Sequence, residues 1–396
     1  MKNKAVVLGA NYYIGLSIAR GLGKEGIPVA LVDYKREGSY AFDSKYCSEI
    51  LIAPHYKNEE QAFCDFLIDY AKKQEAKPVL FPCADPYVEF IDKHFHEQKE
   101  VFLFNQETEH LTVDAMDKSK LSEMAVKHGV KLPRSIAIDD PDLLKKVDEI
   151  GYPVIVKPAD SSAFVSTFRI KMFKVENEKE LLEKIAACKA KNLVVFVQQI
   201  IPGFDDHMYT YDMYIDQKGQ VTHWTTCQKQ RQYPINFGAS VFTKQRWVPE
   251  LHEIGAPFFQ AIKWRGFAEI EFKKHAVTGE YYLIEINVRT TNFNAMLDHI
   301  GLNFPLIAYR ELTGNPMPPK SIETDTNVHF WYAYEDLLAI RNYIQTKQLR
   351  FGDVLASFRV PKVEAVYQKG DAKPFHSFMK MIAKKLWASV KRKWTR

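Results

Sequence analysis

Acidic side chains recur at alternate positions along residues 267–291, and this pattern restricts the fold more than any other in the chain. The stretch reads FAEIEFKKHAVTGEYYLIEINVRTT and predicts two strands joined by a turn at Thr278–Gly279. Successive side chains of a strand point to opposite faces, so the acids of each strand share one face. The aligned residues are Glu269 and Glu271 on the first strand and Glu285, Asn287 and Arg289 on the second.

Carboxylates aligned in this way repel each other unless a cation lies among them. Oxygen ligands from two Glu and one Asn suit Mg²⁺, which commonly binds one or two carboxylates together with substrate phosphates. Arg289 follows on the same face and could bind a phosphate or a carboxylate through two hydrogen bonds. The alternative is an exposed hairpin face with ordinary alternating polarity.

Length and composition indicate a globular protein of two or three domains, with 396 residues, 46% of them hydrophobic and 26% charged. A net charge of +5 is too small to indicate nucleic-acid binding. Five scattered cysteines without CxxC spacing predict reduced thiols in a cytosolic compartment rather than zinc sites or disulfides. We find no signal-peptide pattern at Met1 and no apolar run near 18 residues, so no membrane span is expected.

The N-terminal third has the pattern of a doubly wound α/β sheet. Strands are expected at Ala5–Leu8 and at 28–32, separated by GANYYIG and a helix. A dinucleotide site needs G-x-G-x-x-G, and Asn11 stands at the second glycine, which argues against nicotinamide binding. Further on, Asp85 is expected to cap a helix, although a ligand contact at the strand end stays open.

In the middle of the chain, the strand of YPVIVKP delivers Lys157 among apolar residues. A buried lysine is costly unless it meets an anion such as phosphate, although a lysine at a strand end can also reach solvent. A second apolar strand, LVVFVQQ at 193–199, presents backbone groups that could hold a flat base. Asp205 or Asp206 follows and could accept hydrogen bonds from ribose hydroxyls.

In this order, these motifs resemble the ATP-grasp superfamily, in particular its carboxylate–amine ligase branch with the D-aspartate ligases of bacterial cell-wall synthesis. The resemblance covers roughly residues 4–315. It rests on GANYYIG, FPCADPYVEFI, MDKSKL, YPVIVKPAD, VQQIIPG and, most specifically, the E-I-N-x-R of the acidic hairpin.

The resemblance implies ATP and Mg²⁺ or Mn²⁺ as cofactors, and it implies a role for each matching residue. Magnesium would be held by Glu271, Glu285 and Asn287. Arg289 would hold the transferred phosphoryl group or an acyl phosphate, and Lys229 and Arg231 would add cations. The ATP phosphates would be contacted by Lys118 and Lys157 and by the flap serines Ser161 and Ser162. The adenine would lie against Gln198, Gln199 and Ile200, with Asp206 on the ribose.

Two departures from the family pattern affect the nucleotide site. Many relatives have a glycine-rich flap after the position of Lys157, whereas this chain has DSSAFVST. Gln199 stands where many relatives have Glu, and its amide oxygen could still accept a hydrogen bond from an adenine amino group.

The implied fold is α/β. It comprises a Rossmann-like pre-ATP-grasp domain (1–112), a two-subdomain ATP-grasp fold with antiparallel sheets (lid 113–196, catalytic 197–318), and a C-terminal extension (319–372). The implied activity is amide formation between a small-molecule carboxylate and an amine, on an amino acid or a cell-envelope precursor, through an acyl phosphate. Two alternatives stay open: another phosphoryl-transfer or carboxylating ATP-grasp enzyme, and a non-catalytic, membrane-associated nucleotide-binding regulator.

The last segment, 373–396, predicts a basic amphipathic helix without acidic residues. One stripe of it would carry Phe375, Met379, Ile382, Leu386, Val390 and Trp394. Such a helix is typical of peripheral binding to the inner face of a membrane by a cytoplasmic protein. The alternatives are a helix packed on the protein itself or a disordered basic end.

Overall fold

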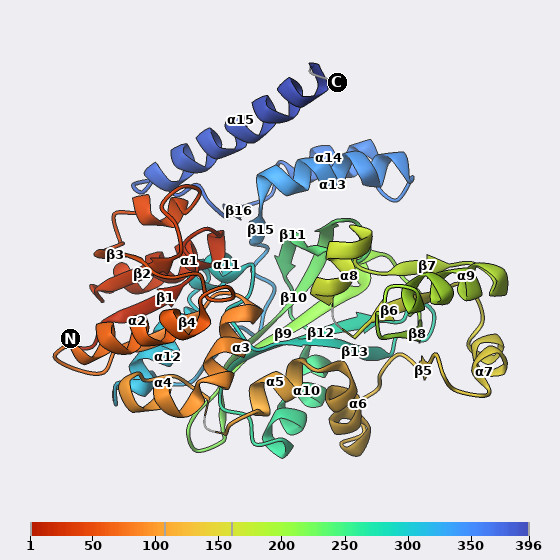
Figure 1. Ribbon diagram of the computed structural model, residues 1–396, viewed down its shortest axis with the longest axis horizontal. Helices are drawn as coiled ribbons and strands as arrows, with labels where there is room; N and C mark the ends of the chain where they lie inside the picture. Colours follow the sequence, from red (N-terminus) through yellow and green to blue (C-terminus); the bar gives the residue numbers. More distant parts are fainter. Residues whose placement is uncertain (1, 107, 160, 395–396) are drawn as a thin grey trace.

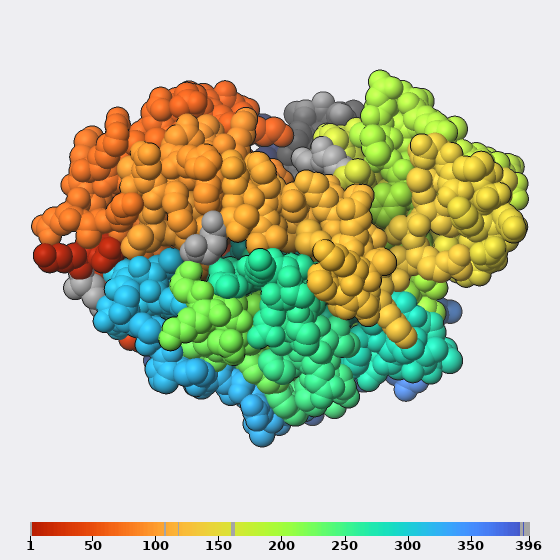
Figure 2. Space-filling model, turned by 90° about the horizontal axis from the view of Figure 1, so that it is seen from below, coloured from red at the N-terminus to blue at the C-terminus, as the bar shows by residue number. Residues whose placement is uncertain are grey.

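A computed structural model describes residues 2–106, 108–159 and 161–394. These residues form three β-sheets with helices packed around them (Figure 1). The smaller antiparallel sheet and its helices form a lobe at one end of the molecule, and the N-terminal sheet lies at the other (Figure 2). The expected α/β class and the sheets of mixed orientation are confirmed.

The N-terminal sheet is parallel, with strand order β3-β2-β1-β4. Its strands are β1 (Ala5–Leu8), β2 (Val29–Asp33), β3 (Glu49–Ile52) and β4 (Val79–Pro82). Around them lie α1 (Tyr13–Gly23), the 3₁₀ turn η1 (Tyr40–Asp43), α2 (Glu60–Lys72), α3 (Asp85–Lys93) and α4 (Phe95–Val101). β1 and β2 are buried along their whole length, as expected for parallel strands covered on both faces.

The turn between β1 and α1 packs tightly against neighbouring backbone atoms. Asp33 at the end of β2 accepts hydrogen bonds from the backbone N–H of Tyr34 and from the hydroxyl of Ser39, at 2.8 Å each. Gly15 packs so closely on this turn that a Cβ there would lie 2.1 Å from the carbonyl oxygen of Gly9. This close approach requires glycine at position 15.

The lobe contains an antiparallel sheet of order β5-β8-β6-β7. Its strands are β5 (Ser135–Ala137), β6 (Val154–Pro158), β7 (Phe173–Val175) and β8 (Val195–Gln199). The helices that precede or cover it are α5 (Leu111–Met116), α6 (Lys118–Lys127), α7 (Leu143–Ile150), α8 (Ser161–Phe168) and α9 (Glu178–Lys189).

The flap sequence is a helix, α8, and the strand β7 begins at Phe173. Without glycine, this segment has no residue suited to an extended loop with positive φ. Aromatic packing holds the helix instead. The ring of Phe164 is fully buried and lies 4.9 Å from that of Phe168 and 5.2 Å from that of Phe173.

The largest sheet has order β13-β12-β9-β10-β11-β15-β16, with β14 paired to β10. Its strands are β9 (Met208–Ile215), β10 (Val221–Tyr233), β11 (Ala239–Gln245), β12 (Gly266–Lys274), β13 (Tyr281–Asn287), β14 (Lys320–Ser321), β15 (His329–Trp331) and β16 (Lys362–Glu364). The accompanying helical segments are η2 (Asp205–His207), α10 (Pro249–Ala261), α11 (Asn294–His299), α12 (Phe304–Leu312), α13 (Ala333–Gln345), α14 (Phe351–Ser357) and α15 (Lys373–Trp394). β15 and β16 continue this sheet, so the expected boundary at residue 318 does not separate two sheets.

The C-terminal helix α15 packs on the N-terminal sheet for its first half and then runs away from it (Figure 1). Phe378 and Ile382 are buried, and Ser377 donates a hydrogen bond to Asp43 of η1. Met379, Leu386 and Trp387 are exposed, so the expected apolar stripe is divided between two environments. The side chains of Val390 and Trp394, also placed on that stripe, lie outside the described residues. Among the residues described, no helix is long and apolar enough to cross a membrane.

A buried ion pair fastens the chain before α15 to the N-terminal sheet. The guanidinium of Arg20 donates to the carboxylate and to the carbonyl oxygen of Asp371, at 2.9 Å each. Ser44 and the backbone N–H of Lys45 also donate to this carboxylate. We expect Asp371→Ala to lower the free energy of unfolding by about 3–5 kcal/mol, because it leaves the Arg20 charge buried without a partner. Urea denaturation would measure this.

Glu37→Gln is the matched control, since Glu37 pairs with Lys384 of α15 in full solvent exposure. Burial alone would raise the pKa of Asp371, but the bonds from Lys45, Ser44 and Arg20 hold it below its ordinary value. The Asp371 contribution should therefore be complete above about pH 4 and be lost as the pH falls through the depressed pKa. An equal loss in both variants would contradict the role of the buried pair.

Candidate active site

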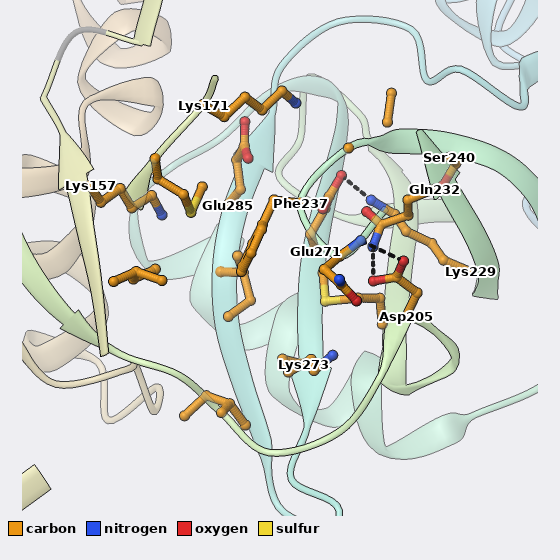
Figure 3. A pocket seen from close by; sticks show the side chains of 18 of the residues that line it. Lys157, Lys171, Asp205, Lys229, Gln232, Phe237, Ser240, Glu271, Lys273 and Glu285 are labelled. Carbon is orange, nitrogen blue, oxygen red and sulfur yellow. Dashed lines mark hydrogen bonds and ion pairs between the residues drawn. The ribbon is translucent and has the colours of Figure 1, made fainter. Parts of the chain in front are cut away.

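A cavity of about 600 Å³ lies between the small antiparallel sheet and the largest sheet (Figure 3). β6 and β8 contribute one wall, and β12 and β13 contribute the facing wall. Nine of the predicted site residues line this one cavity: Lys157, Gln198, Gln199, Ile200, Lys229, Glu271, Glu285, Asn287 and Arg289. The nine residues lie up to 132 positions apart in the sequence, from Lys157 to Arg289, and the fold brings them into the lining of one cavity.

The acidic hairpin has the geometry that its alternation predicts. Glu269 lies opposite Asn287, and Glu271 lies opposite Glu285, in the antiparallel register of β12 and β13. All four side chains line the cavity. Glu285 is exposed to it and has no hydrogen bond or ion pair with any described residue. The face that the sequence assigned to ligands is therefore turned towards a cavity rather than towards open solvent.

The buried acids are compensated by specific partners. Nζ of Lys229 lies 2.6 Å from Oε1 of Glu271, and Nδ2 of Asn287 donates to Glu269 at 2.8 Å and to Glu271 at 3.3 Å. Burial alone would raise the pKa of Glu271, but Lys229 lowers it. Burial and the nearby charge of Glu271 instead raise the pKa of Glu269. Glu271 is thus held as the anion, and Glu269 is the acid that binds a proton more readily.

Arg289 joins the N-terminal sheet to the cavity. Its Nε donates to Oδ1 of Asp85 at 2.8 Å. Burial would lower the pKa of Arg289, but Asp85, Glu269 and Glu285 raise it. The expectation that Asp85 caps a helix is wrong: Ala84 occupies the cap position of α3, and no side chain caps that end. Asp85 lines the cavity as the partner of Arg289.

Lys157 and the β8 residues form the opposite wall. Nζ of Lys157 donates to Oε1 of Gln198 at 3.3 Å. Burial lowers the pKa of Lys157, and Glu285 and Glu271 across the cavity counteract this. Oε1 of Gln199 accepts a hydrogen bond from the backbone N–H of Arg134 at 3.3 Å and, as an amide oxygen, retains a second lone pair.

The structure does not bring Asp206 to the cavity. Its carboxylate is mostly exposed and pairs with His207 at 2.8 Å. Asp205, its neighbour, does line the cavity but is buried and fully engaged. It accepts hydrogen bonds from Nε2 of Gln232, from the backbone N–H of Asn236 and from the hydroxyl of Tyr343.

Arg231 is also not among the residues that line the cavity. Its guanidinium forms two hydrogen bonds with buried Asp336 of α13, at 2.6 and 2.7 Å. β10 has irregular register between Lys229 and Gln232, and this break in alternation turns Lys229 and Gln232 to the cavity while Arg231 points to α13. The predicted catalytic role of Arg231 is therefore replaced by a structural one. The side chains of Lys118, Ser161 and Ser162 lie outside the described residues.

Among the lining residues that sequence reasoning missed are Lys171, Phe237 and Lys273. Figure 3 shows Lys171 extending towards the side of Glu285. Burial lowers the pKa of Lys273 to about 8, although Asp205 and Asp206 counteract it. Lys273 follows Glu271 at the alternate position of the same strand, so the period of two could have identified it. Lys171 and Phe237 lie between strands and carry no such signal.

Comparison with known proteins finds a family model that matches the middle of the chain. Residues 117–309 match the model of the carbamoyl-phosphate synthase L chain ATP-binding domain, an ATP-grasp domain. A D-aspartate ligase from Enterococcus faecium is 25% identical over 262 residues. That match covers 62% of this chain and 62% of the relative, so the chain spans less than two thirds of the curated relative.

Solved structures share the fold at low sequence identity. The biotin carboxylase of Campylobacter jejuni, in a β,γ-ATP complex, aligns with a TM-score of 0.62 at 20% identity over 82% of this chain and 74% of that one. The N5-carboxyaminoimidazole synthetase of Staphylococcus aureus aligns with a TM-score of 0.61 at 15% identity over 82% and 81%. The chain thus shares the fold of these enzymes, and its residues 117–309 are similar to the ATP-binding domain named by the family model.

Proposed function

We propose that this protein is an ATP-dependent ligase that joins a carboxylate to an amine. In the first step a carboxylate oxygen attacks the γ-phosphorus of ATP, ADP leaves, and an acyl phosphate forms. In the second step the amine nitrogen attacks the acyl carbon, phosphate leaves with the C–O bonding electrons, and the nitrogen loses a proton. One observation carries the proposal: the acids and Asn287 of the hairpin line one cavity together with the cationic side chains of Lys157, Lys171, Lys229, Lys273 and Arg289.

The donor set of the acidic hairpin fits Mg²⁺. Glu271, Glu285 and Asn287 offer oxygen atoms only, and Glu285 has no other partner among the described residues. When bound, the ion would neutralise charge on the β- and γ-phosphate oxygens. Glu271 is already held as an anion by Lys229, so this ligand is charged before any metal arrives.

The positions of the cationic side chains suggest a separate role for each of them. Arg289 is held in place by Asp85 and has the planar donor geometry that matches a phosphoryl or carboxylate group, so we assign it the transfer step. Lys157 and Lys171 approach from the side of the small sheet and would contact ATP phosphates. The backbone of β8 through Ile200, between Lys157 and Lys273, would hold the adenine. We also propose the lid (113–196) and catalytic (197–318) subdomains given by the resemblance, with the cavity between them and with β15 and β16 of the C-terminal extension continuing the catalytic sheet.

Replacing Glu285 by Gln should reduce the rate of ATP turnover by about 10³-fold or more, about 4 kcal/mol of transition-state stabilisation, because the change removes a metal-binding charge. The measurement is phosphate release at saturating Mg²⁺. Glu280→Gln is the control on the same hairpin, since Glu280 pairs with Lys131 outside the cavity. A Glu285→Gln protein as active as the parent would refute the metal assignment.

Phosphate release should depend on an added amine. A panel of L- and D-amino acids is the appropriate screen, with D-aspartate included because the curated relative is named for it. We expect at least one amino acid to stimulate phosphate release and to appear in an amide product by mass spectrometry. Stimulation by bicarbonate alone would favour a carboxylating enzyme, which shares the nucleotide site. Binding of ATP without turnover under every condition would favour a non-catalytic regulator.

The exposed end of α15 supports a proposal of peripheral binding to the inner membrane face. Leu386 and Trp387 are exposed beside Lys384 and Lys385, and anionic lipid attracts such basic surfaces. The protein should cosediment with vesicles containing phosphatidylglycerol, and this binding should weaken at high salt. The double variant Leu386→Ser with Trp387→Ser should lose it. Phe351→Ser, at an exposed site on α14, should not. Equal binding to neutral and anionic vesicles would refute the proposal.

A further inference from the structure

Four titratable side chains meet on the helices beside the N-terminal sheet, outside the active-site cavity. Cys64 lies on α2, His94 lies between α3 and α4, and Glu97 lies on α4 (Figure 1). One ligand atom from each of these three residues lies within 4.8 Å of the other two. Glu60, one turn before Cys64 on α2, contacts the same histidine. None of the four residues lines the cavity.

The ring of His94 lies between two carboxylates. Its Nε2 is 2.9 Å from Oε1 of Glu60, and its Nδ1 is 3.2 Å from Oε2 of Glu97. A neutral imidazole carries a proton on only one nitrogen, so it can donate to only one of these carboxylates. The lone pair of the other nitrogen then faces a carboxylate oxygen. This contact is repulsive unless a second proton or a metal ion lies there.

A sulfur atom beside the histidine favours the metal ion over the proton. The side chain of Cys64 is buried, and its Sγ accepts a hydrogen bond from Nε2 of Gln98 at 3.3 Å. Burial raises the pKa of Cys64 to about 11, so the thiol keeps its proton at neutral pH unless a cation replaces that proton. The side chain of Glu97 is half exposed, so an ion can approach the cluster from solvent on that side. Thiolate, imidazole and carboxylate together are ligands of Zn²⁺.

The distances in the cluster fit this ion. Zn–N and Zn–O bonds of about 2.0–2.2 Å at a tetrahedral angle place the two ligand atoms about 3.3–3.5 Å apart. The distance from Nδ1 of His94 to Oε2 of Glu97 is 3.2 Å. The sulfur of Cys64 lies within 4.8 Å of both ligands, so it needs to approach them by about 1 Å at most to form a Zn–S bond of about 2.3 Å. Glu60 would then accept the remaining ring N–H, as carboxylates commonly do behind metal-bound histidines.

We infer that Cys64, His94 and Glu97 form a zinc-binding site, with water as the fourth ligand. Nδ1 of His94 is the ligand atom, and Glu60 is the positioning residue on Nε2. Binding replaces the S–H bond of Cys64 by a Zn–S bond, and the proton passes to solvent. The ion joins α2 to α3 and α4, so it stabilises the N-terminal domain and does not depend on the proposed function. Cysteine spacing could not predict the site, because its ligands come from separate helices.

Co²⁺ tests the site, because a thiolate ligand gives bound cobalt a sulfur-to-metal charge-transfer absorption in the near ultraviolet. The full-length protein is freed of metal with a chelator and titrated first with Co²⁺ and then with Zn²⁺. We expect Co²⁺ to produce this absorption and Zn²⁺ to remove it by displacement. The ligands proposed for the acidic hairpin include no thiol, so cobalt bound there does not contribute.

Three variants and a control identify the ligands. Cys64→Ser should abolish the absorption, and Glu97→Gln should weaken Zn²⁺ binding at a half-exposed position. Glu60→Gln should weaken Zn²⁺ binding about 10–100-fold but keep the absorption at saturating Co²⁺, as expected of a positioning residue. Cys47→Ser is the matched control, since Cys47 is a partly buried thiol of the same domain outside the cluster, and it should behave as the parent.

The absence of the absorption in the parent would overturn the site and would leave a doubly protonated His94 between the two carboxylates. Its persistence in Cys64→Ser would also overturn the site. If Cys64→Ser does not fold, Glu97→Gln decides, because a Zn²⁺ affinity equal to that of the parent contradicts the assignment. Zn²⁺ should raise the thermal midpoint of the parent more than that of Glu97→Gln at the same concentration. An equal rise would contradict a site built on Glu97.

Discussion

Three carboxylates on adjacent strands of one sheet repel each other, and other residues of the site compensate this negative charge. Glu269, Glu271 and Glu285 face one cavity, and the first two are buried or nearly so. Like charges at this separation would favour protonation or separate the strands, so the fold must bring compensating groups. It does so with Lys229 on Glu271 and with hydrogen bonds from Asn287 and Thr291 on Glu269. Glu285 alone is left without a direct protein partner among the described residues.

The compensating groups are themselves held by distant parts of the chain. Lys229 lies on β10 just before the irregular register that turns Arg231 towards Asp336 of α13. Arg289 is held by Asp85, the first residue of α3. The site therefore depends on the N-terminal domain and the C-terminal extension as well as on the hairpin. The C-terminal extension also continues the sheet that contains the acidic hairpin.

The hairpin could be predicted from the sequence because strand alternation is a local rule. Glu271, Glu285, Asn287 and Arg289 needed only a period of two to be placed together, and the family resemblance then gave them roles. Arg231 could not be excluded in this way, because the register break at that point shows only in the pairing of β10 with β11. The sequence likewise could not show that Asp205 lines the cavity and that Asp206 does not.

The two aspartates are adjacent and chemically identical, and only tertiary contacts distinguish them. Asp205 is buried by partners from β10, the following loop and α13, and Asp206 turns outward to His207. The α8 helix is a related case. A missing glycine indicated that the usual flap would differ, but the helix itself depends on the aromatic packing of Phe164 with Phe173, which lies beyond the segment.

Charge pairing before ligand binding gives the cavity its chemical character. Arg289 and Lys229 each pair with one carboxylate and stay charged despite burial. Among the described residues, Lys157 has only the amide oxygen of Gln198 as a direct partner, and burial lowers its pKa. Arg289 and Lys229 are thus oriented before a ligand binds. Lys157 has no carboxylate partner among the described residues, so an anion that binds in the cavity would stabilise its charge most. Glu285 is the corresponding acid, exposed to the cavity without a direct partner among the described residues. A polyanion that arrives with a divalent cation would satisfy both Lys157 and Glu285 at once, and a simple anion would satisfy only the lysine.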